Sequence, residues 1–474
     1  MARREKQLGD RIGWIMTAGL CGLMAGSTLA FGTVEPWSIA LLGLTVTGLL
    51  LLWAVKSLVE QRVELRVPPV LLPLAALLIY GVLQSLSYTD GTGQRRGLSM
   101  DVEATRLALE LVAGLLIVSL IAARILEERN KLSAVGNFLI FFGLTLAVFG
   151  LIQHFTWNGK YYWILEPSAP PTSPFGPFVN HNHFAGYLEM IVPIPIALVL
   201  RRAVRGEKAI LYGFAAVIMG VAVIVSLSRG GMISLLSGLM FVVILSFRSS
   251  ESGEEYSTGR RFPRALSRLA AAALIVSTIG AGVWWVGADS VVRRVERTDL
   301  AGGGREPGGE TFYQSRGWIW QDTTAMIRDH WLTGVGLGAY PTAYPIYNER
   351  NGQLAVKQAH NDYLQIVADC GILGGVAALS FMVLVIRDIL RALRHRDRNR
   401  SAWALGCGGG VLAMFVHSLF DFNLQLPSNA LLFMVLTVVI SNISWAAMSS
   451  QVDSPGFDRD PRGRGVAQEL EVYS

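Results

Sequence analysis

Charged residues are scarce in this sequence. They make up only 16% of the 474 residues, and 52% are hydrophobic, whereas a soluble protein typically has about 25% charged residues. Cysteine is also rare: Cys21, Cys370 and Cys407 occur without a CxxC pair or any other metal-ligand spacing. This composition disfavours a soluble fold and a cysteine-based metal site, and we expect the three cysteines to be small core residues.

Apolar segments recur along the whole chain. Each is about 20 residues long, which is the length a helix needs to cross the hydrocarbon core of a membrane. We therefore predict an all-α polytopic membrane bundle of about 12 spans, whose 50 glycines suit close helix packing in lipid. The expected spans are 12–32, 37–55, 68–87, 104–123, 133–153, 184–200, 209–227, 231–247, 269–287, 363–386, 402–419 and 428–448.

Basic residues fall in alternate short connections between these spans. Clusters occur at 3–11, 56–66, 124–131, 201–208, 248–264 and 387–400, whereas 31–35 and 421–427 contain none. The positive-inside rule then predicts that both termini are cytoplasmic. We attribute the net charge of +6 to this topology signal and expect no nucleic-acid partner.

The same topology places three longer segments, 88–103, 154–180 and 288–360, on the outer face. Within the last of these, the glycine-rich residues 301–309 are expected to be flexible. Apolar and aromatic residues at helical spacing predict a helix over 312–330, lying on the membrane surface. Residues 334–338, Gly-Val-Gly-Leu-Gly, predict a turn, and no Lys-Ser/Thr follows to make a phosphate loop.

Four polar motifs are expected to meet on the outer face: 180–183, 228–231, 315–317 and 358–365. Arg229 and Arg316 are candidates to bind a phosphate group, because the guanidinium fork matches its geometry. His360 is a candidate general base, because a neutral imidazole can take a proton from a hydroxyl. Together these residues suit attack of a hydroxyl on a diphosphate-activated group.

Simpler interpretations exist for the same residues. An arginine at a helix end often extends to lipid headgroups, Arg316 could form an ion pair on a surface helix, and His360 could cap a helix. His181 and His183 form a weak metal pair without cysteine or acidic partners, and we expect no metal. Ionisable residues inside a span are costly and often functional. The predicted spans contain Glu110, Glu189 and Asp369.

One spacing resembles a known family. His360-Asn361, nine further residues, Gly371 and then Gly374 match the HNx9GxxG signature of bacterial O-antigen ligases and related Wzy-type polymerases. The similarity covers about residues 175–385, and His330-Trp331 departs from it where the family often has a proline. Other similar segments are 178–186, 228–230, Arg316 with Trp320, and 334–336.

This resemblance implies a helix bundle with a large periplasmic loop and metal-free transfer of a glycan from undecaprenyl diphosphate to an acceptor hydroxyl. Arg229 and Arg316 would bind the diphosphate, and His360 would activate the acceptor. The expected partners are the lipid-linked glycan, a glycan or lipid A-core acceptor, and membrane lipids, with no cofactor. Further substrate-binding residues are expected at Asn180, His181, His183 and Asn361.

We divide the chain into N-terminal membrane helices (1–174), a ligase-like region (175–449) and a disordered cytoplasmic tail (450–474). The expected location is the bacterial inner membrane, with the active face periplasmic. O-antigen ligation, polymerisation of a surface polysaccharide or exopolysaccharide, and glycan transfer to protein all remain open. The alternative class is a transporter or flippase of lipid-linked saccharides. Such proteins often consist of two repeated halves, with helices broken at matching positions.

Overall fold

The computed structural model describes residues 2–89, 91, 95–166, 174–248, 312–348 and 356–452. These parts of the chain are helical apart from turns, isolated bridges and one short antiparallel hairpin, β1 (Ser87–Thr89) with β2 (Arg95–Gly97). Nine helical segments of the described residues are long and apolar enough to cross a membrane, and one of them is His181–Leu200, which two consecutive helices form. The chain is therefore an all-α polytopic membrane protein, as predicted.

The described helices follow the predicted spans closely. The predicted span 269–287, the glycine-rich 301–309 and most of the tail lie outside the described residues. In chain order the helices are α1 (Ala2–Leu29), α2 (Pro36–Val59), η1 (Pro69–Leu71), α3 (Leu72–Ser85), α4 (Val102–Ile125), α5 (Arg129–Phe155), α6 (His181–Ile191), α7 (Pro193–Leu200), α8 (Glu207–Val225), α9 (Arg229–Arg248), α11 (Phe312–Asp329), α12 (Tyr340–Ala343), η3 (Tyr344–Ile346), α13 (Asp362–Ala392), α14 (Arg398–His417), η4 (Asn423–Gln425) and α15 (Pro427–Val452).

The structure differs from the prediction most clearly at the two ends of the chain and within one predicted span. The first helix begins near the N-terminus at Ala2, and the last continues to Val452, two residues beyond the expected start of the tail. The predicted span 184–200 is divided into α6 and α7. Pro193 and Pro195 stand at the start of α7, where the lack of a backbone N–H interrupts a continuous helix.

The centre of the bundle is formed by α14 and α15. Every residue of α14 from Ser401 to Val411 is buried, and α14 packs against α6, α7, α9 and α15. A Cβ added at Gly238 in α9 would lie 2.5 Å from the carbonyl oxygen of Gly409 in α14. The two backbones approach so closely only because both positions are glycine.

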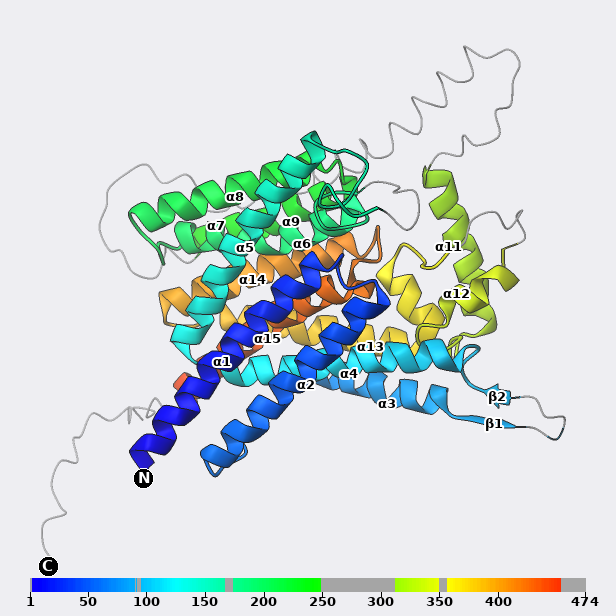
Figure 1. Cartoon of the computed structure of the whole chain (residues 1–474), viewed down its shortest axis with the longest axis horizontal. Helices are drawn as coiled ribbons and strands as arrows, with labels where there is room; N and C mark the ends of the chain where they lie inside the picture. The colour runs from blue at the N-terminus through cyan, green and yellow to red at the C-terminus, as the bar shows by residue number, and fades with distance from the viewer. Residues whose placement is uncertain are drawn as a thin grey trace, which may run out of the picture.

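Non-spanning elements gather at one end of the bundle. Figure 1 shows α11, α12 and the hairpin together at this end, with α11 running crosswise to the spans. We call it the α11 end. The first residues of α1 lie at the opposite end (Figure 1).

The long helix α13 is interrupted close to its start. Gly371 has φ 59° and ψ −151°, so residues 362–370 form a short helical piece separate from the rest. The 334–338 turn lies in this break, where Val335 N–H donates to Ala368 O at 2.9 Å. A Cβ on Gly371 would lie 2.5 Å from the backbone of Leu332. The nine residues between Asn361 and Gly371 are therefore the length of this first helical piece.

Candidate active site

The predicted motifs lie at helix starts, where backbone N–H groups need acceptors. Asn180 caps α6, its Oδ1 accepting from the N–H of Asn182 at 2.9 Å. Ser228 precedes α9, and its Oγ accepts from Gly231 N–H at 3.1 Å. Asn361 caps α13, its Oδ1 accepting from the N–H groups of Tyr363 and Leu364, each at 3.0 Å. These caps fix the entry of three helices and so position the residues beside them.

A buried carboxylate that the sequence did not reveal lies at the centre of these motifs. Asp421, between α14 and η4, is 1% exposed. Its Oδ2 accepts from Asn182 Nδ2 at 2.6 Å and from Arg316 Nη2 at 3.4 Å. Its Oδ1 lies 3.2 Å from His360 Nδ1. Asp421 thus brings α6, α11 and the start of α13 to one point.

The surroundings of Asp421 keep it ionised. Burial opposes ionisation, but the hydrogen bond from His360 and the positive charge of Arg316 outweigh it, so the pKa of Asp421 lies well below its usual range. A carboxylate accepts hydrogen bonds and cannot donate them. His360 therefore places its hydrogen on Nδ1, and in the neutral ring Nε2 is left as the proton acceptor.

His360 is held from several sides. Its backbone has φ 49°, in the left-handed region, and the preceding carbonyl of Ala359 accepts from Trp320 Nε1 at 2.9 Å. The imidazole packs edge-on against Phe422 with ring centroids 4.8 Å apart. The His360 side chain is 25% exposed. The ring is therefore oriented by the protein and still accessible.

The two arginines occupy different positions. Arg316, in α11, has a side chain only 12% exposed and donates through Nη1 to the carbonyl of Phe420 as well as to Asp421. Arg229 begins α9 and is half-buried. Its neighbour Ser228 donates to Asn182 Oδ1 at 2.7 Å, and Asn182 in turn contacts Asp421. The start of α9 is thus joined to the Asp421 cluster through Asn182.

The remaining predicted residues differ in exposure. His181 is half-buried at the start of α6. His183 is buried, packs edge-on against Phe422 at 4.8 Å, and its Nε2 has no hydrogen-bond partner in the described part of the chain. Asn361 is 9% exposed and also donates to Leu419 O at 3.1 Å. Its amide is thus already engaged in fixing the start of α13.

A second buried pair lies beneath this cluster. His417 Nδ1 is 3.0 Å from both carboxyl oxygens of Glu189. A Cβ on Gly230 would lie 3.1 Å from His417 Nε2, so the start of α9 passes directly over the imidazole. This contact accounts for Glu189, one of the acidic residues that the sequence placed inside a span.

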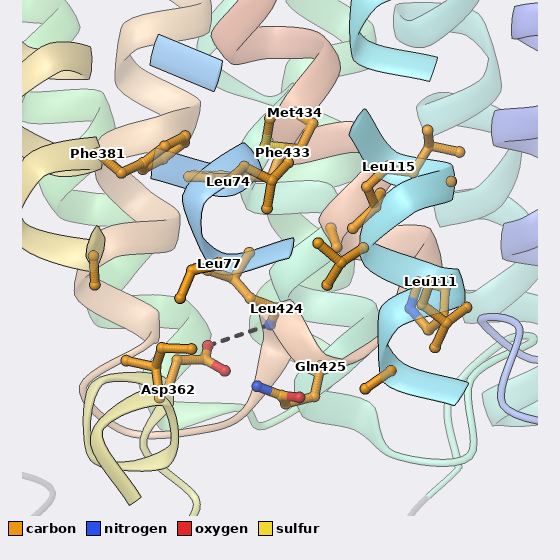
Figure 2. Close-up of a pocket in the computed structure, with 18 of the residues that line it drawn as sticks. Leu74, Leu77, Leu111, Leu115, Asp362, Phe381, Leu424, Gln425, Phe433 and Met434 are labelled. Carbon is orange, nitrogen blue, oxygen red and sulfur yellow. Dashed lines mark hydrogen bonds between the residues drawn. The ribbon is translucent and has the colours of Figure 1, made fainter. Parts of the chain in front are cut away.

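An apolar chamber opens beside the cluster. It has a volume of about 290 Å³ and lies between α3, α4, α13 and α15. Figure 2 shows Leu74, Leu77, Phe433 and Met434 lining it, with Asp362 and Gln425 together at one end. Asp362 accepts from Ser418 Oγ at 2.8 Å and from Leu424 N–H at 3.2 Å. Because Asp362 is two residues from His360, the polar end of the chamber adjoins the cluster.

Among the described residues, no three His, Cys, Asp or Glu side chains are grouped to hold a metal ion. That the reaction needs no metal is implied by the family resemblance and stays a prediction.

One family model matches the chain. Residues 214–379 match the family described as O-antigen ligase, and no curated protein matches the sequence. The matched segment includes Arg229, Arg316, His360 and the HNx9GxxG spacing. It leaves out Asn182, which contacts Ser228, and Asp421, which contacts His360. Residues 214–379 of this multi-pass membrane chain therefore resemble the O-antigen ligase family, as the HNx9GxxG spacing predicted.

Proposed function

We propose that the protein transfers a glycan from an undecaprenyl-diphosphate-linked donor to an acceptor hydroxyl at the periplasmic face. The family match over residues 214–379 supports an O-antigen ligase- or polymerase-type enzyme that acts on a lipid-linked glycan and an acceptor. The observation that carries the finer proposal is the cluster in which Asp421 contacts both Arg316 and His360. It supports the proposal because a guanidinium group, which suits phosphate, and an oriented imidazole both contact one carboxylate.

His360 acts as the general base. Nε2 takes the proton of the acceptor hydroxyl while that oxygen attacks the anomeric carbon of the donor sugar. The bond from this carbon to the diphosphate oxygen breaks, and the lipid diphosphate leaves with the electron pair. Asp421 holds the Nδ1 hydrogen and stabilises the imidazolium that forms, as a carboxylate does in a catalytic triad.

Arg229 and Arg316 bind the diphosphate. Negative charge grows on the leaving oxygen as the bond breaks, and guanidinium groups stabilise it best when they are fixed beforehand. Arg316 meets this condition through its contacts with Asp421 and Phe420. Arg229 approaches from α9, whose start is tied to Asn182 by Ser228.

The apolar chamber holds part of the lipid chain of the donor. Its lining comes from membrane helices and is mostly leucine, phenylalanine and other apolar side chains. Its polar end at Asp362 adjoins the segment that carries His360. A lipid chain in the chamber would thus leave its diphosphate near the cluster.

The transporter alternative has less support. Two of the described membrane segments are broken, α13 at Gly371 and the α6–α7 pair at Pro193. The break in α13 comes after its first nine residues, whereas the α6–α7 break divides its span near the middle. These are not the matching positions that a repeated transporter architecture would give.

The proposal is tested with purified protein, a defined undecaprenyl-diphosphate glycan and separate candidate acceptors. We expect glycan transfer with wild type, whereas His360→Ala should transfer none and still retain donor lipid. Both quantities are measured in one preparation. Near wild-type transfer by His360→Ala would exclude it as the base, and loss of donor binding would give it a structural or diphosphate-binding role.

The same preparation separates the two functional classes. Reconstituted into vesicles with donor but no acceptor, a flippase would move labelled donor between leaflets, whereas the proposed enzyme should leave its distribution unchanged. Movement without transfer to any acceptor would favour the transporter alternative.

A further inference from the structure

A second pocket lies far from the Asp421 cluster. It has a volume of about 320 Å³ and is lined by the segment before η1 and by the last turns of α13 and α15. His360 precedes the first residue of α13, whereas the pocket is reached only in the last turns, and from the break at Gly371 to Arg387 the helix covers roughly 24 Å at about 1.5 Å per residue. This length is most of the roughly 30 Å hydrocarbon core, and the basic residues 387–400 follow directly, so the predicted topology puts the pocket at the opposite membrane interface from His360.

The lining of this pocket is basic. It contains three arginines, Arg66, Arg387 and Arg391, and a single acidic residue, Asp388. Ser441 and Ser444 of α15 add hydroxyl groups. The Ser444 hydroxyl donates to Asp388 Oδ1 at 3.3 Å, and the lining as a whole carries an excess of positive charge.

Two of the arginines are fixed by neighbours. Arg66 donates to Glu127 Oε1 at 2.5 Å, and its guanidinium carbon lies 5.1 Å from the centre of the Trp445 ring. Arg387 donates through Nε and Nη2 to Asp388 Oδ1, at 3.1 and 2.9 Å. Guanidinium groups held in this way lose little freedom when they bind a ligand.

Arg391 stands one turn further along α13 and is exposed. In the described part of the chain its side chain has no hydrogen-bond or ion-pair partner, unlike Arg66 and Arg387. A positive-inside signal requires only charge in a loop. It does not require a pocket in which three arginines from two separate segments converge.

The rim of the pocket is apolar and faces outward. Trp445 is 52% exposed, and the lining residues Leu65 and Val67 are 57% and 49% exposed. Tryptophan at a helix end is typical of the membrane interface, with its ring at the level of the headgroups. An amphipathic ligand in this pocket would have its polar head against the arginines and its apolar part against the apolar rim.

We propose that this pocket binds the phosphate of an anionic phospholipid in the leaflet opposite the Asp421 cluster. Basic pockets between membrane helices suit such headgroups, and arginine forks match phosphate geometry. The apolar rim would lie along the upper acyl chains. This site is independent of the proposed reaction, so either can fail without the other.

The test compares two pairs of substitutions that remove the same charge from the same segment. Arg387→Gln with Arg391→Gln alters the pocket, whereas Arg394→Gln with Arg396→Gln lies outside its lining. Full-length protein in neutral detergent is titrated with phosphatidylglycerol, and the retained lipid is counted by native mass spectrometry. We expect the pocket pair to weaken binding by about 10-fold or more, and the control pair by about 2-fold or less.

Three results would overturn the proposal. Equal weakening by both pairs would mean non-specific attraction to basic residues. Equal binding of phosphatidylcholine would remove the preference for an anionic lipid. Displacement of phosphatidylglycerol by an equal concentration of inorganic phosphate would identify a site for a soluble anion.

A fold defect is separated from a binding defect by a third variant. Arg391→Gln alone changes an exposed side chain and leaves the Arg387–Asp388 pair intact. It should unfold at the wild-type temperature in lipid-free detergent and still bind phosphatidylglycerol more weakly than wild type. Wild-type binding by this variant would contradict the role given to Arg391.

Discussion

At the scale of single residues, Asp421 determines how His360 can act. Its low pKa keeps it a carboxylate, which orients the imidazole and leaves Nε2 to accept a proton. The sequence indicated His360 and both arginines through their motifs. It gave no sign of Asp421, which lies in a short connection with no distinguishing spacing. Its role comes from contacts with Asn182, Arg316 and His360, which only the folded chain brings together.

Asp421→Asn should slow transfer by about 10²–10⁴-fold, because an amide can donate to Nδ1 and favour the wrong tautomer. The measurement is kcat at saturating acceptor, together with donor retention. Glu166→Gln is the matched control, since Glu166 is an exposed carboxylate on the segment before α6 and contacts only Lys160 in the described structure. Unchanged kcat in Asp421→Asn would remove Asp421 from the mechanism.

Stability provides a check on the charge of Asp421. Its folded pKa lies below the unfolded value of about 3.9, so its contribution is full above that pH and is lost as the pH falls toward the folded pKa. The gap in unfolding temperature between wild type and Asp421→Asn should be constant from about pH 5 to pH 8 and narrower at about pH 3. A gap that widens on acidification would mean that Asp421 is protonated in the folded protein.

The arginines should act through geometry as well as charge. Arg229→Lys and Arg316→Lys each keep the charge but lose the two-pronged fork, and each should reduce transfer by about 10²–10³-fold. The comparison is made at equal expression. The control is Arg202→Lys, which changes an exposed arginine in the connection after α7. Near-full activity in both variants would support the simpler interpretation of Arg229 as a lipid-facing helix end.

At the scale of elements, hydrophobic length predicted most helices, because spanning a membrane imposes a long apolar run. The interruptions were not predicted. The break in α13 depends on the 334–338 turn, which follows α11 and binds the backbone at residues 368–369. Because this contact joins two segments that are separated in the sequence, the hydrophobic pattern of α13 does not reveal it. Gly371 is the one residue in the helix sequence that reflects the break.

Gly371→Ala tests whether that break positions His360. The new Cβ would meet Leu332 at 2.5 Å, and the residue would keep φ 59°, so we expect a loss of at least about 1–3 kcal/mol of stability and most transfer activity. Gly375→Ala is the matched control on the same helix, where the nearest atom is a methyl of Val367 at 3.3 Å. It should be neutral or stabilising, since alanine favours a helix. Equal effects of the two substitutions would deny the break a special role.

At the scale of the whole molecule, the arrangement of the helices comes from the structure, and their orientation in the membrane is a prediction from the sequence. The structure gathers α11, α12 and the Asp421 cluster at one end, while the basic loops indicate which side of the membrane that end faces. The division at residue 174 stays a prediction. Helices from both predicted parts pack together, because α1 and α4 contact α15.

Reporter fusions check the orientation. A fusion after Arg202, between α7 and α8, should report the cytoplasm, and one after Asn348, beyond η3, should report the periplasm. A third fusion after His395, between α13 and α14, should agree with the first. The same location for Arg202 and Asn348 would refute the topology and the periplasmic site.

The position of Asp421 also limits how this protein could be recombined with its relatives. The segment that is recognisable as O-antigen ligase ends at residue 379, yet Asp421 and Asn182 lie on either side of it. A chimera that exchanged only 214–379 would carry over His360 and Arg316 and leave their carboxylate to the host chain. The smallest portable unit therefore runs from the start of α6 to η4, and inheritance of this chemistry should follow that longer stretch.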